Sequence, residues 1–344
     1  MKGLSWGIIG PGAIADVFAQ GLIEHGHGHV TRVLGQRRPR AEAFAARHGG
    51  EVVDSIDGMF DATAGGAPEA VYVATPHTLH GEYVARALVE HVPVLVEKPL
   101  TTRPAHTAAL IEGAARHRVP LMEGWMYRGH PQASRTLELV RSGAIGELRE
   151  IHAEFAFDCP LDPRHRLFDP ELGGGAIWDV GGYPLSFTLG IARVTAEVGQ
   201  DPLQEMELVE ASGSVTSTGV DGDARCRLRF GSVEAHLACS IQRAGGSSAR
   251  VVGSSGELVL REPWLLEGER RGLRGELELR TPAGIERIEV ASEQDCFALE
   301  AAELASLIAA GEVSPRFPYV DHDETLSIAR LADEWQSRIL GQRA

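Results

Sequence analysis

The sequence predicts an α/β protein in which a doubly wound parallel sheet precedes an α+β region with a large, open, mostly antiparallel sheet. Up to about residue 122, continuous runs of Val, Ile and Leu alternate with amphipathic helical segments, as in a parallel sheet covered on both faces. From residue 123 the apolar residues alternate with period two, which is typical of an antiparallel sheet with one exposed face. The 344 residues suffice for two domains, which we place at 1–122 and 123–344.

The individual elements follow from these periods and from turn residues. In the first region we expect strands at 4–9, 29–34, 51–53, 70–74, 93–96 and 119–122, with helices at 14–24, 39–48, 81–90 and 104–117. In the second region a helix at 131–142 leads into strands at 148–155, 207–215, 223–230, 232–241, 249–253, 276–280 and 286–290. Two long helical patterns, 295–310 and 322–340, come last, and the Gly/Arg-rich stretch 267–275 is typical of a surface loop.

Net charge, hydropathy and cysteine spacing limit which partners and which cellular compartment we expect for this protein. A formal net charge of −15 repels polyanions, so we expect no nucleic-acid partner. No apolar run approaches the length of a membrane helix, and the N-terminus runs directly into a strand without an apolar signal region. The four scattered cysteines show no C-x-x-C spacing and are expected to be reduced thiols. These features predict a cytoplasmic protein and do not identify its substrate.

A glycine turn predicts a dinucleotide site. Residues 10–15 fit the pattern G-x-G-x-x-A, and they follow a strand and open a helix, which is the context that gives the pattern meaning. Gly10 permits the tight turn, and Gly12 lets the backbone approach a pyrophosphate. Together with Ala13 and Ile14, it presents the free N–H groups of a helix N-terminus to the phosphates. The alternative is a glycine turn without a ligand.

The end of the second strand discriminates between cofactors. An NAD-specific site usually has a carboxylate there for the ribose 2′-hydroxyl. This chain has Gln36, Arg37 and Arg38 instead. Because a guanidinium holds a 2′-phosphate in a forked geometry, we predict NADP(H) over NAD(H), with Arg37 ahead of Arg38. The alternative is that both arginines are solvated turn residues.

The tripeptide Glu97-Lys98-Pro99 follows the apolar strand 93–96. Open α/β sheets bind ligands at the carboxyl ends of their strands, so Lys98 is expected to face the reactive ring of the cofactor. The sequence therefore predicts Lys98 as a proton-handling group beside a nicotinamide, with Glu97 at the same edge.

The segment 173–184 is the second candidate for chemistry. If it is helical after its glycines, Asp179 and Tyr183 are four residues apart and share a face. Gly181 and Gly182 would each cost about 1 kcal/mol in a helix, which suggests that a nicotinamide or substrate approaches the backbone there. Pro184 either kinks or starts a helix, and both readings stay open. A buried tyrosine and a capping aspartate are the alternative.

An ammonium beside a phenol favours the phenolate, so Tyr183 is expected to take the proton from a substrate hydroxyl while the substrate carbon gives a hydride. Lys98 would either tune Tyr183 or carry the proton itself. Asp179 would accept a hydrogen bond from a neighbouring substrate hydroxyl or orient Lys98.

These motifs resemble the Gfo/Idh/MocA family, named for glucose-fructose oxidoreductase and inositol dehydrogenase. The resemblance rests on residues 10–15, 74–80, 97–99, 123–132 and 173–183, which occur in the family's order. It implies a Rossmann domain and a second domain whose open sheet makes a homodimer or homotetramer, with Lys98 as the catalytic lysine. It also implies a nicotinamide pocket lined by Thr75, Pro76, His77 and His80. Since tyrosine stands where many members have histidine, the chain looks like the subgroup of dihydrodiol and xylose dehydrogenases, which tends toward NADP.

The expected reaction is hydride transfer between nicotinamide and a sugar, polyol or vicinal diol. The alternatives are a dihydrodiol dehydrogenase acting on aromatic diols and a catalytically silent, cofactor-sensing regulator. We expect the substrate wall to include Trp125, Arg128, Phe168 and Trp178 besides the catalytic candidates. For His80 two roles stay open: it either caps the following helix or contacts a ligand. Three histidines within 25–29 invite a metal, but a solvated connection is favoured, and no metal is predicted.

Overall fold

The computed structural model describes residues 3–264 and 273–341; most of the loop predicted at 267–275 therefore lies outside the described residues. The chain divides into two compact units. The first comprises residues 1–101, 105–126 and 294–322, and the second comprises 102–104, 127–293 and 323–344. The predicted assignment of separate functions to 1–122 and 123–344 stays a prediction.

The first unit contains the predicted parallel sheet. Within the described residues it has six strands in the order β3-β2-β1-β4-β5-β6, all parallel. The strands are β1 (Leu4–Ile9), β2 (Gly28–Leu34), β3 (Glu51–Val53), β4 (Ala70–Val73), β5 (Val94–Glu97) and β6 (Leu121–Gly124). The order reverses between β1 and β4, so the carboxyl ends of these two strands form the switch point at which open α/β sheets bind ligands.

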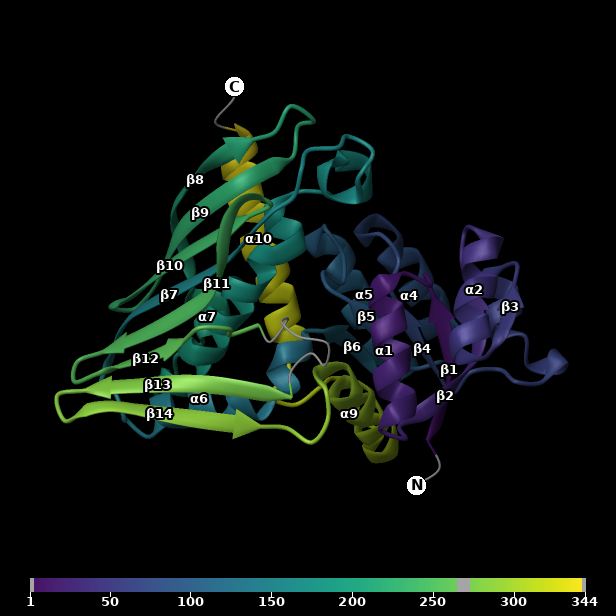
Figure 1. Cartoon of the computed structure of the whole chain (residues 1–344), viewed down its shortest axis with the longest axis horizontal. Helices are drawn as coiled ribbons and strands as arrows, with labels where there is room; N and C mark the ends of the chain where they lie inside the picture. Colours follow the sequence, from purple (N-terminus) through teal and green to yellow (C-terminus); the bar gives the residue numbers. More distant parts are fainter. Residues whose placement is uncertain (1–2, 265–272, 342–344) are drawn as a thin grey trace. The chain divides into compact units, whose positions relative to one another are not determined.

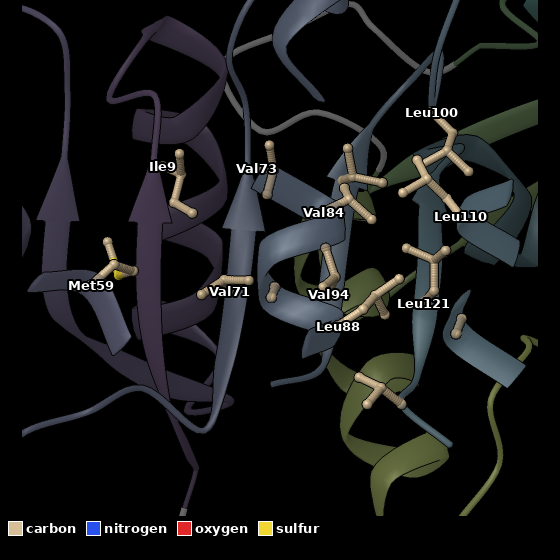
Figure 2. Close-up of a cluster of buried hydrophobic side chains, with 14 of the residues drawn as sticks. Ile9, Met59, Val71, Val73, Val84, Leu88, Val94, Leu100, Leu110 and Leu121 are labelled. Atoms are coloured by element: carbon tan, nitrogen blue, oxygen red, sulfur yellow. The ribbon is translucent and has the colours of Figure 1, made fainter. Parts of the chain in front are cut away.

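Helices accompany this sheet as the apolar spacing predicts. They are α1 (Ala13–Glu24), α2 (Arg38–His48), α3 (Ile56–Phe60), α4 (His80–Val89), α5 (Pro104–His117) and α9 (Cys296–Ala310). Figure 2 shows side chains from strands and helices in one of the buried clusters, among them Val73 of β4 and Val84 of α4. Full burial of each such side chain stabilises the fold by about 1.5–3 kcal/mol relative to exposure.

The second unit contains the predicted open sheet. Among residues 127–264 and 273–293, eight strands pair in the order β14-β13-β12-β11-β7-β10-β9-β8. The strands are β7 (Leu148–Asp158), β8 (Glu207–Val215), β9 (Asp221–Phe230), β10 (Val233–Ser240), β11 (Gln242–Gly253), β12 (Glu257–Leu260), β13 (Arg274–Thr281) and β14 (Gly284–Ala291). All neighbours are antiparallel except β7 and β10, which run parallel. The fold class is confirmed; the short strand β12 was not predicted.

Helices of the second unit pack on one face of its sheet, as Figure 1 shows for α7 (Gly182–Thr195) and α10 (His322–Gly341). Trp335 of α10 is fully buried and donates its indole N–H to the carbonyl of Arg225 in β9 at 3.1 Å. The remaining helices are α6 (Pro131–Arg141) and the short α8 (Pro202–Glu205). In the part of the chain that is described, no helix combines the length and the apolar character needed to cross a membrane.

Candidate functional site

The glycine turn joins β1 to α1 in the predicted way. Gly10 has φ +91°, and a Cβ there would lie 2.6 Å from the carbonyl oxygen of Ala74, so only glycine fits this turn. Gly12 is the N-cap of α1 and gives that helix no side-chain cap. The first N–H groups of α1, beginning at Ala13 and Ile14, are therefore left for a ligand such as a phosphate.

A cleft of about 460 Å³ opens at this turn. Its walls come from the carboxyl ends of β1, β2 and β4 and from the starts of the helices that follow. The predicted cofactor residues that line it are Gly10, Gly12, Gln36, Arg37, Thr75 and Pro76. The lining also includes Arg40, Asp54, Ser55, Leu79, Glu82 and Tyr83, which were not predicted. The cleft lies at the sheet edge and switch point where a dinucleotide is expected.

The three neighbouring arginines have different surroundings. Arg37 and Arg40 line the cleft, and Arg40 Nη2 lies 3.8 Å from the position that a Cβ atom would take on Gly12. Arg38 instead forms ion pairs with Glu42, at 2.9 Å, and with Asp54. The hydrogen bonds that Arg38 donates to Asp54 and Glu42 raise its pKa. Arg38 therefore holds the carboxylate of Asp54, while its neighbours present guanidinium groups to the cleft.

The Lys98 turn is held from three sides within the first unit. The Tyr72 hydroxyl donates to Glu97 Oε1 at 2.6 Å, and the Leu100 N–H donates to Glu123 Oε1 at 2.7 Å. A ring nitrogen of His80 lies 2.8 Å from the carbonyl oxygen of Pro99. Lys98 itself is half-buried, and its peptide bond to Pro99 is cis. Such surrounding hydrogen bonds fix the backbone from which a reactive side chain projects.

His77 and His80 follow the cleft-lining loop, with their rings 5.9 Å apart in an edge-on arrangement. Both side chains are buried. His80 is the first residue of α4 and its ring contacts carbonyl oxygens, so the structure gives it a role other than the predicted helix cap. The roles of His77 and His80 in cofactor binding stay predictions.

The segment around Asp179 begins as a π-turn, η6 (Ile177–Gly181), and continues as α7 from Gly182. This answers the question about Pro184: α7 continues the π-turn without a break, since Gly181 and Gly182 both have helical backbone angles, so Pro184 lies inside a helical stretch and does not start a helix. Single π-turns in helices often occur at functional sites. The buried Asp221 accepts a hydrogen bond from the Ile177 N–H at 2.7 Å and so holds the start of the π-turn.

Glycine in this segment has a reason different from the predicted ligand approach. A Cβ on Gly181 would lie 3.1 Å from Cys239 Sγ and 3.3 Å from a ring carbon of Trp335. A Cβ on Gly175, which has φ +118°, would lie 2.4 Å from Asp221 Oδ1. At Gly181 the protein's own core accounts for the glycine, and the approach of a nicotinamide or substrate to this segment stays a prediction.

Asp179 is bonded to an arginine that the sequence left unassigned. Arg166 Nη1 donates to Asp179 Oδ1 at 3.0 Å, and the Arg166 side chain is 49% exposed whereas that of Asp179 is 7% exposed. Tyr183 lies one turn later among aromatic rings. Its ring centroid is 5.2 Å from that of Phe155 and 5.6 Å from that of Trp264. These contacts hold the Tyr183 ring at separations that are favourable for aromatic pairs.

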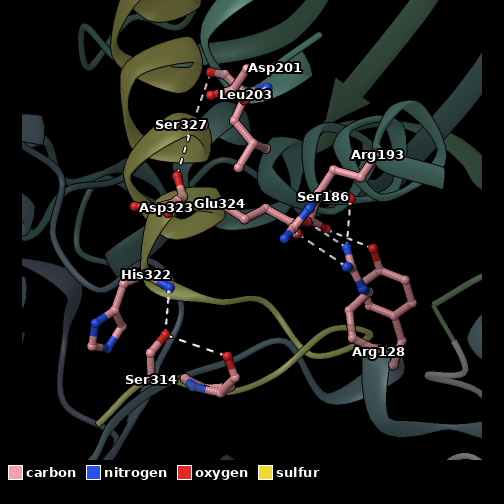
Figure 3. A network of polar contacts seen from close by, with 12 residues as sticks. Arg128, Ser186, Arg193, Asp201, Leu203, Ser314, His322, Asp323, Glu324 and Ser327 are labelled. Carbon is pink, nitrogen blue, oxygen red and sulfur yellow. Dashed lines mark hydrogen bonds and ion pairs between the residues drawn. The ribbon is translucent and has the colours of Figure 1, made fainter. Parts of the chain in front are cut away.

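Arg128 has partners that explain its presence without a substrate. Its guanidinium binds the Glu324 carboxylate through two bonds, at 2.6 and 3.2 Å, and also donates to the carbonyl of Ser186 (Figure 3). Burial opposes the charge of Arg128, but the Glu324 carboxylate and the Tyr127 hydroxyl together outweigh that effect and raise the pKa of the guanidinium. These contacts account for the buried guanidinium without a substrate, and the contact of Arg128 with a substrate stays a prediction.

The predicted wall residues Trp125, Phe168 and Trp178 are all buried. The indole N–H of Trp178 donates to Gln336 Oε1 at 2.9 Å. Their contact with a substrate stays a prediction. In the loop at 25–29, His27 contacts Gln294 Oε1 at 2.8 Å and His25 lies 3.5 Å from Asp295, so these histidines pack against the start of α9 rather than being simply solvated.

Comparison with known proteins decides the family. Residues 4–125 match the oxidoreductase family with an NAD-binding Rossmann fold, and residues 134–259 match the GFO/IDH/MocA C-terminal domain. The chain belongs to the Gfo/Idh/MocA oxidoreductase family. The predicted resemblance and the NAD(P)-binding character of the first unit are confirmed.

Relatives and solved structures agree with this membership. Mouse trans-1,2-dihydrobenzene-1,2-diol dehydrogenase is 30% identical over 277 residues, covering 78% of this chain and 79% of that protein. A dTDP-3,4-didehydro-2,6-dideoxy-α-D-glucose 3-reductase from Saccharopolyspora spinosa is 32% identical over 259 residues, covering 73% and 74%. The structure of a 3-ketoreductase from Actinomadura kijaniata in complex with NADP and TDP-benzene has a TM-score of 0.82 at 26% identity, covering 96% of each chain.

The sequence analysis did not single out Arg40 or Asp221. A local sequence pattern could have indicated Arg40 but not Asp221. Arg40 comes three residues after Arg37 at the start of a predicted helix, so helical spacing could have indicated it. Asp221 meets the π-turn from a strand 44 residues away, and no local pattern predicts that contact.

Proposed function

We propose that this member of the family transfers a hydride between NADP(H) and the hydroxyl or carbonyl carbon of a sugar, polyol or vicinal diol. The observation that carries the proposal is the arrangement of the first unit. The glycine turn opens a cleft at the switch point of the sheet, and Lys98 follows β5 at the same edge, one strand beyond β4. The nicotinamide, when bound, supplies the hydride chemistry, and the protein supplies the orientation and the proton transfer.

NADP(H) is proposed over NAD(H) because of the charges in the cleft. Arg37 and Arg40 present guanidinium groups, which can hold a 2′-phosphate through forked hydrogen bonds. Two carboxylates, Asp54 and Glu82, share this cleft, and Asp54 is paired with Arg38. The solved structure from Actinomadura kijaniata contains NADP, which supports the same cofactor here.

Lys98 and Tyr183 are proposed as the proton-transfer pair. Tyr183 would take the proton from the substrate hydroxyl in oxidation and return it in reduction, and Lys98 would stabilise the phenolate or carry the proton itself. Asp179 would accept a hydrogen bond from a substrate hydroxyl, with Arg166 holding the carboxylate. These assignments rest on residue chemistry and on the family's pattern.

An aromatic diol is the second candidate substrate. The rings of Phe155, Trp264 and Tyr127 lie within 5.9 Å, centroid to centroid, of the Tyr183 ring. All four rings are buried, so the other three surround Tyr183 with apolar groups. The mouse relative named for a benzene diol supports the same candidate.

We also propose that two copies associate through the face of the second sheet opposite α7 and α10. On that face His152 and His236 stack with ring centroids 5.0 Å apart. Beside them Glu154 and Arg250 line a hollow of about 350 Å³. Light scattering that gives the mass of a monomer at micromolar concentration would contradict this assembly.

The function is tested by following NADPH or NADH absorbance with aldoses, inositols, 3-keto sugars and aromatic trans-dihydrodiols, in both directions. We expect turnover with at least one class and a preference for NADP(H). Tight NADPH binding without turnover on any of these compounds would instead support a cofactor-sensing regulator. The absence of both binding and turnover would overturn the cofactor assignment as well.

A further inference from the structure

The buried His80 ring contacts the backbone at two separate places. Its exposed fraction is 0%. Nδ1 lies 2.8 Å from the carbonyl oxygen of Pro99, and Nε2 lies 2.8 Å from the carbonyl oxygen of Thr75. One side chain at the start of α4 therefore joins two segments of chain that are otherwise 24 residues apart.

Both segments belong to the proposed site. Thr75 lines the cofactor cleft directly after β4. Pro99 follows Lys98 directly after β5. Since β4 and β5 are neighbouring parallel strands, with Val73 opposite Val96, the His80 ring spans the carboxyl ends of the two strands. It thereby ties the cleft-lining loop to the turn that carries Lys98.

Two further contacts hold this turn. The Tyr72 hydroxyl donates to the Glu97 side chain, and Glu123 accepts a hydrogen bond from the Leu100 N–H. His80 adds contacts to the backbone on both sides of the site.

Hydrogen-bond chemistry sets what the His80 ring must supply for both contacts to be hydrogen bonds. Carbonyl oxygens accept and never donate, whereas a neutral imidazole has a single N–H. Both contacts are hydrogen bonds only when both ring nitrogens carry a proton, which is the imidazolium form. A glutamine at this position carries its two N–H donors on one nitrogen, so it cannot reproduce bonds that leave from two sides of a ring.

We propose that His80 is a positioning residue for hydride transfer, which sets Lys98 relative to the cleft-lining loop by donating to Pro99 and Thr75 together. The proposal rests on the proposed function for the role of Lys98. It predicts that the loss of His80 lowers turnover much more than cofactor affinity, because the cleft keeps its phosphate-binding turn while the reactive amine is displaced. A displacement of about 1 Å at a reactive group costs about 100-fold in rate.

The test compares H80Q with H322Q. His322 is a matched control, because its Nε2 also lies 2.8 Å from a backbone carbonyl in the same unit, that of Leu121. In H80Q we expect kcat to fall about 100-fold while the NADPH dissociation constant stays within about threefold of wild type. H322Q is expected to keep kcat. Equal kcat in H80Q and wild type, or equal losses in the two variants, would overturn the proposal.

A neutron crystal structure of the wild-type protein decides the bonding without a variant. Deuterium on both ring nitrogens of His80 is expected, with both carbonyls still within hydrogen-bond distance. Deuterium on a single nitrogen would overturn the proposal even if H80Q failed to fold. If the wild type bound NADPH but turned over no substrate, the proposed function would fail, and the neutron result would still decide whether His80 joins the two segments.

Discussion

Arg166 and Asp179 are joined by a hydrogen-bonded ion pair of 3.0 Å, formed between the loop before the glycine run and the π-turn after it. Asp179 is nearly buried while Arg166 is half-exposed, so the guanidinium holds the carboxylate and still presents part of itself to solvent. The sequence singled out Asp179 and left Arg166 without a role. The pair gives Arg166 one: it orients the carboxylate that we propose to bind substrate.

Replacing Arg166 with Met should therefore raise the substrate KM about tenfold, which corresponds to about 1.4 kcal/mol of binding energy. The NADPH dissociation constant should be unchanged. Arg164 provides the control, because it lies two residues away, is 90% exposed and pairs with Asp162. Steady-state kinetics of R166M and R164M make the comparison. An unchanged KM in R166M would mean that Asp179 does not bind substrate in the proposed way.

Cofactor preference should depend on Arg37 and Arg40. Charge-assisted hydrogen bonds to a phosphate contribute about 1.5–3 kcal/mol each. R37A and R40A should therefore weaken NADPH binding by about 10- to 100-fold and leave NADH binding nearly unchanged. Fluorescence titration of both cofactors measures this, with R47A as the control, since Arg47 pairs with Asp16 outside the cleft lining. Equal losses for the two cofactors would argue against a 2′-phosphate contact.

The Arg128–Glu324 pair should be important for stability. Both side chains are almost completely buried, at 2% and 0% exposure, so R128M leaves the Glu324 carboxylate without its closest cation. Such a change destabilises a protein by about 3–5 kcal/mol. R193M should cost less, because Arg193 is partly exposed and bonds to Glu324 once. Urea denaturation of the wild type, R128M and R193M measures the free energy of unfolding of each protein. A free energy of unfolding in R128M equal to that of wild type would refute this assignment.

Glu300 of α9 should destabilise the fold at neutral pH. It is fully buried, and neither carboxyl oxygen has a hydrogen-bond partner in the described structure. Burial raises the pKa of Glu300 well above its ordinary value, with Glu97 adding to the effect. Because the folded-state pKa is the higher one, the folded state keeps a proton that the unfolded chain releases, so stability falls as the pH rises above the ordinary glutamate pKa.

E300Q removes that dependence. We expect its melting temperature to match or fall below that of wild type in acid and to exceed it increasingly toward neutral pH. E51Q, which changes an exposed side chain of β3, should show no such trend. Thermal unfolding of the three proteins across pH measures it. A pH-independent difference between E300Q and wild type would show that the Glu300 carboxyl is not held neutral by burial.

The features that the sequence predicted well are local ones. The Gly10 turn, the strand before Lys98 and the first-sheet elements all follow from neighbouring residues, because a positive φ or a buried parallel strand leaves its mark within a few positions. The prediction that ligands gather at one sheet edge then follows from topology. Arg37 was expected at this edge for the same reason, since it follows the end of β2 by three residues, and it lines the cleft.

The features that the sequence did not predict depend on contacts between distant residues. Arg128 is paired with a carboxylate 196 positions later, so no spacing distinguishes it from a substrate-binding arginine. Gly181 leaves room for Cys239 and Trp335, which come from other elements. The first half of β11, with Gly245 and Gly246, has no apolar alternation and was therefore missed. In each case tertiary packing outweighs the local signal.

The proton-transfer pair is tested most directly by K98M and Y183F, with hydride transfer followed in a single turnover on a substrate identified in the screen. General acid–base groups contribute about 10²- to 10⁴-fold to rate, so each variant should lose that much while still binding NADPH as wild type does. Hydride transfer at the wild-type rate in both variants would contradict the account.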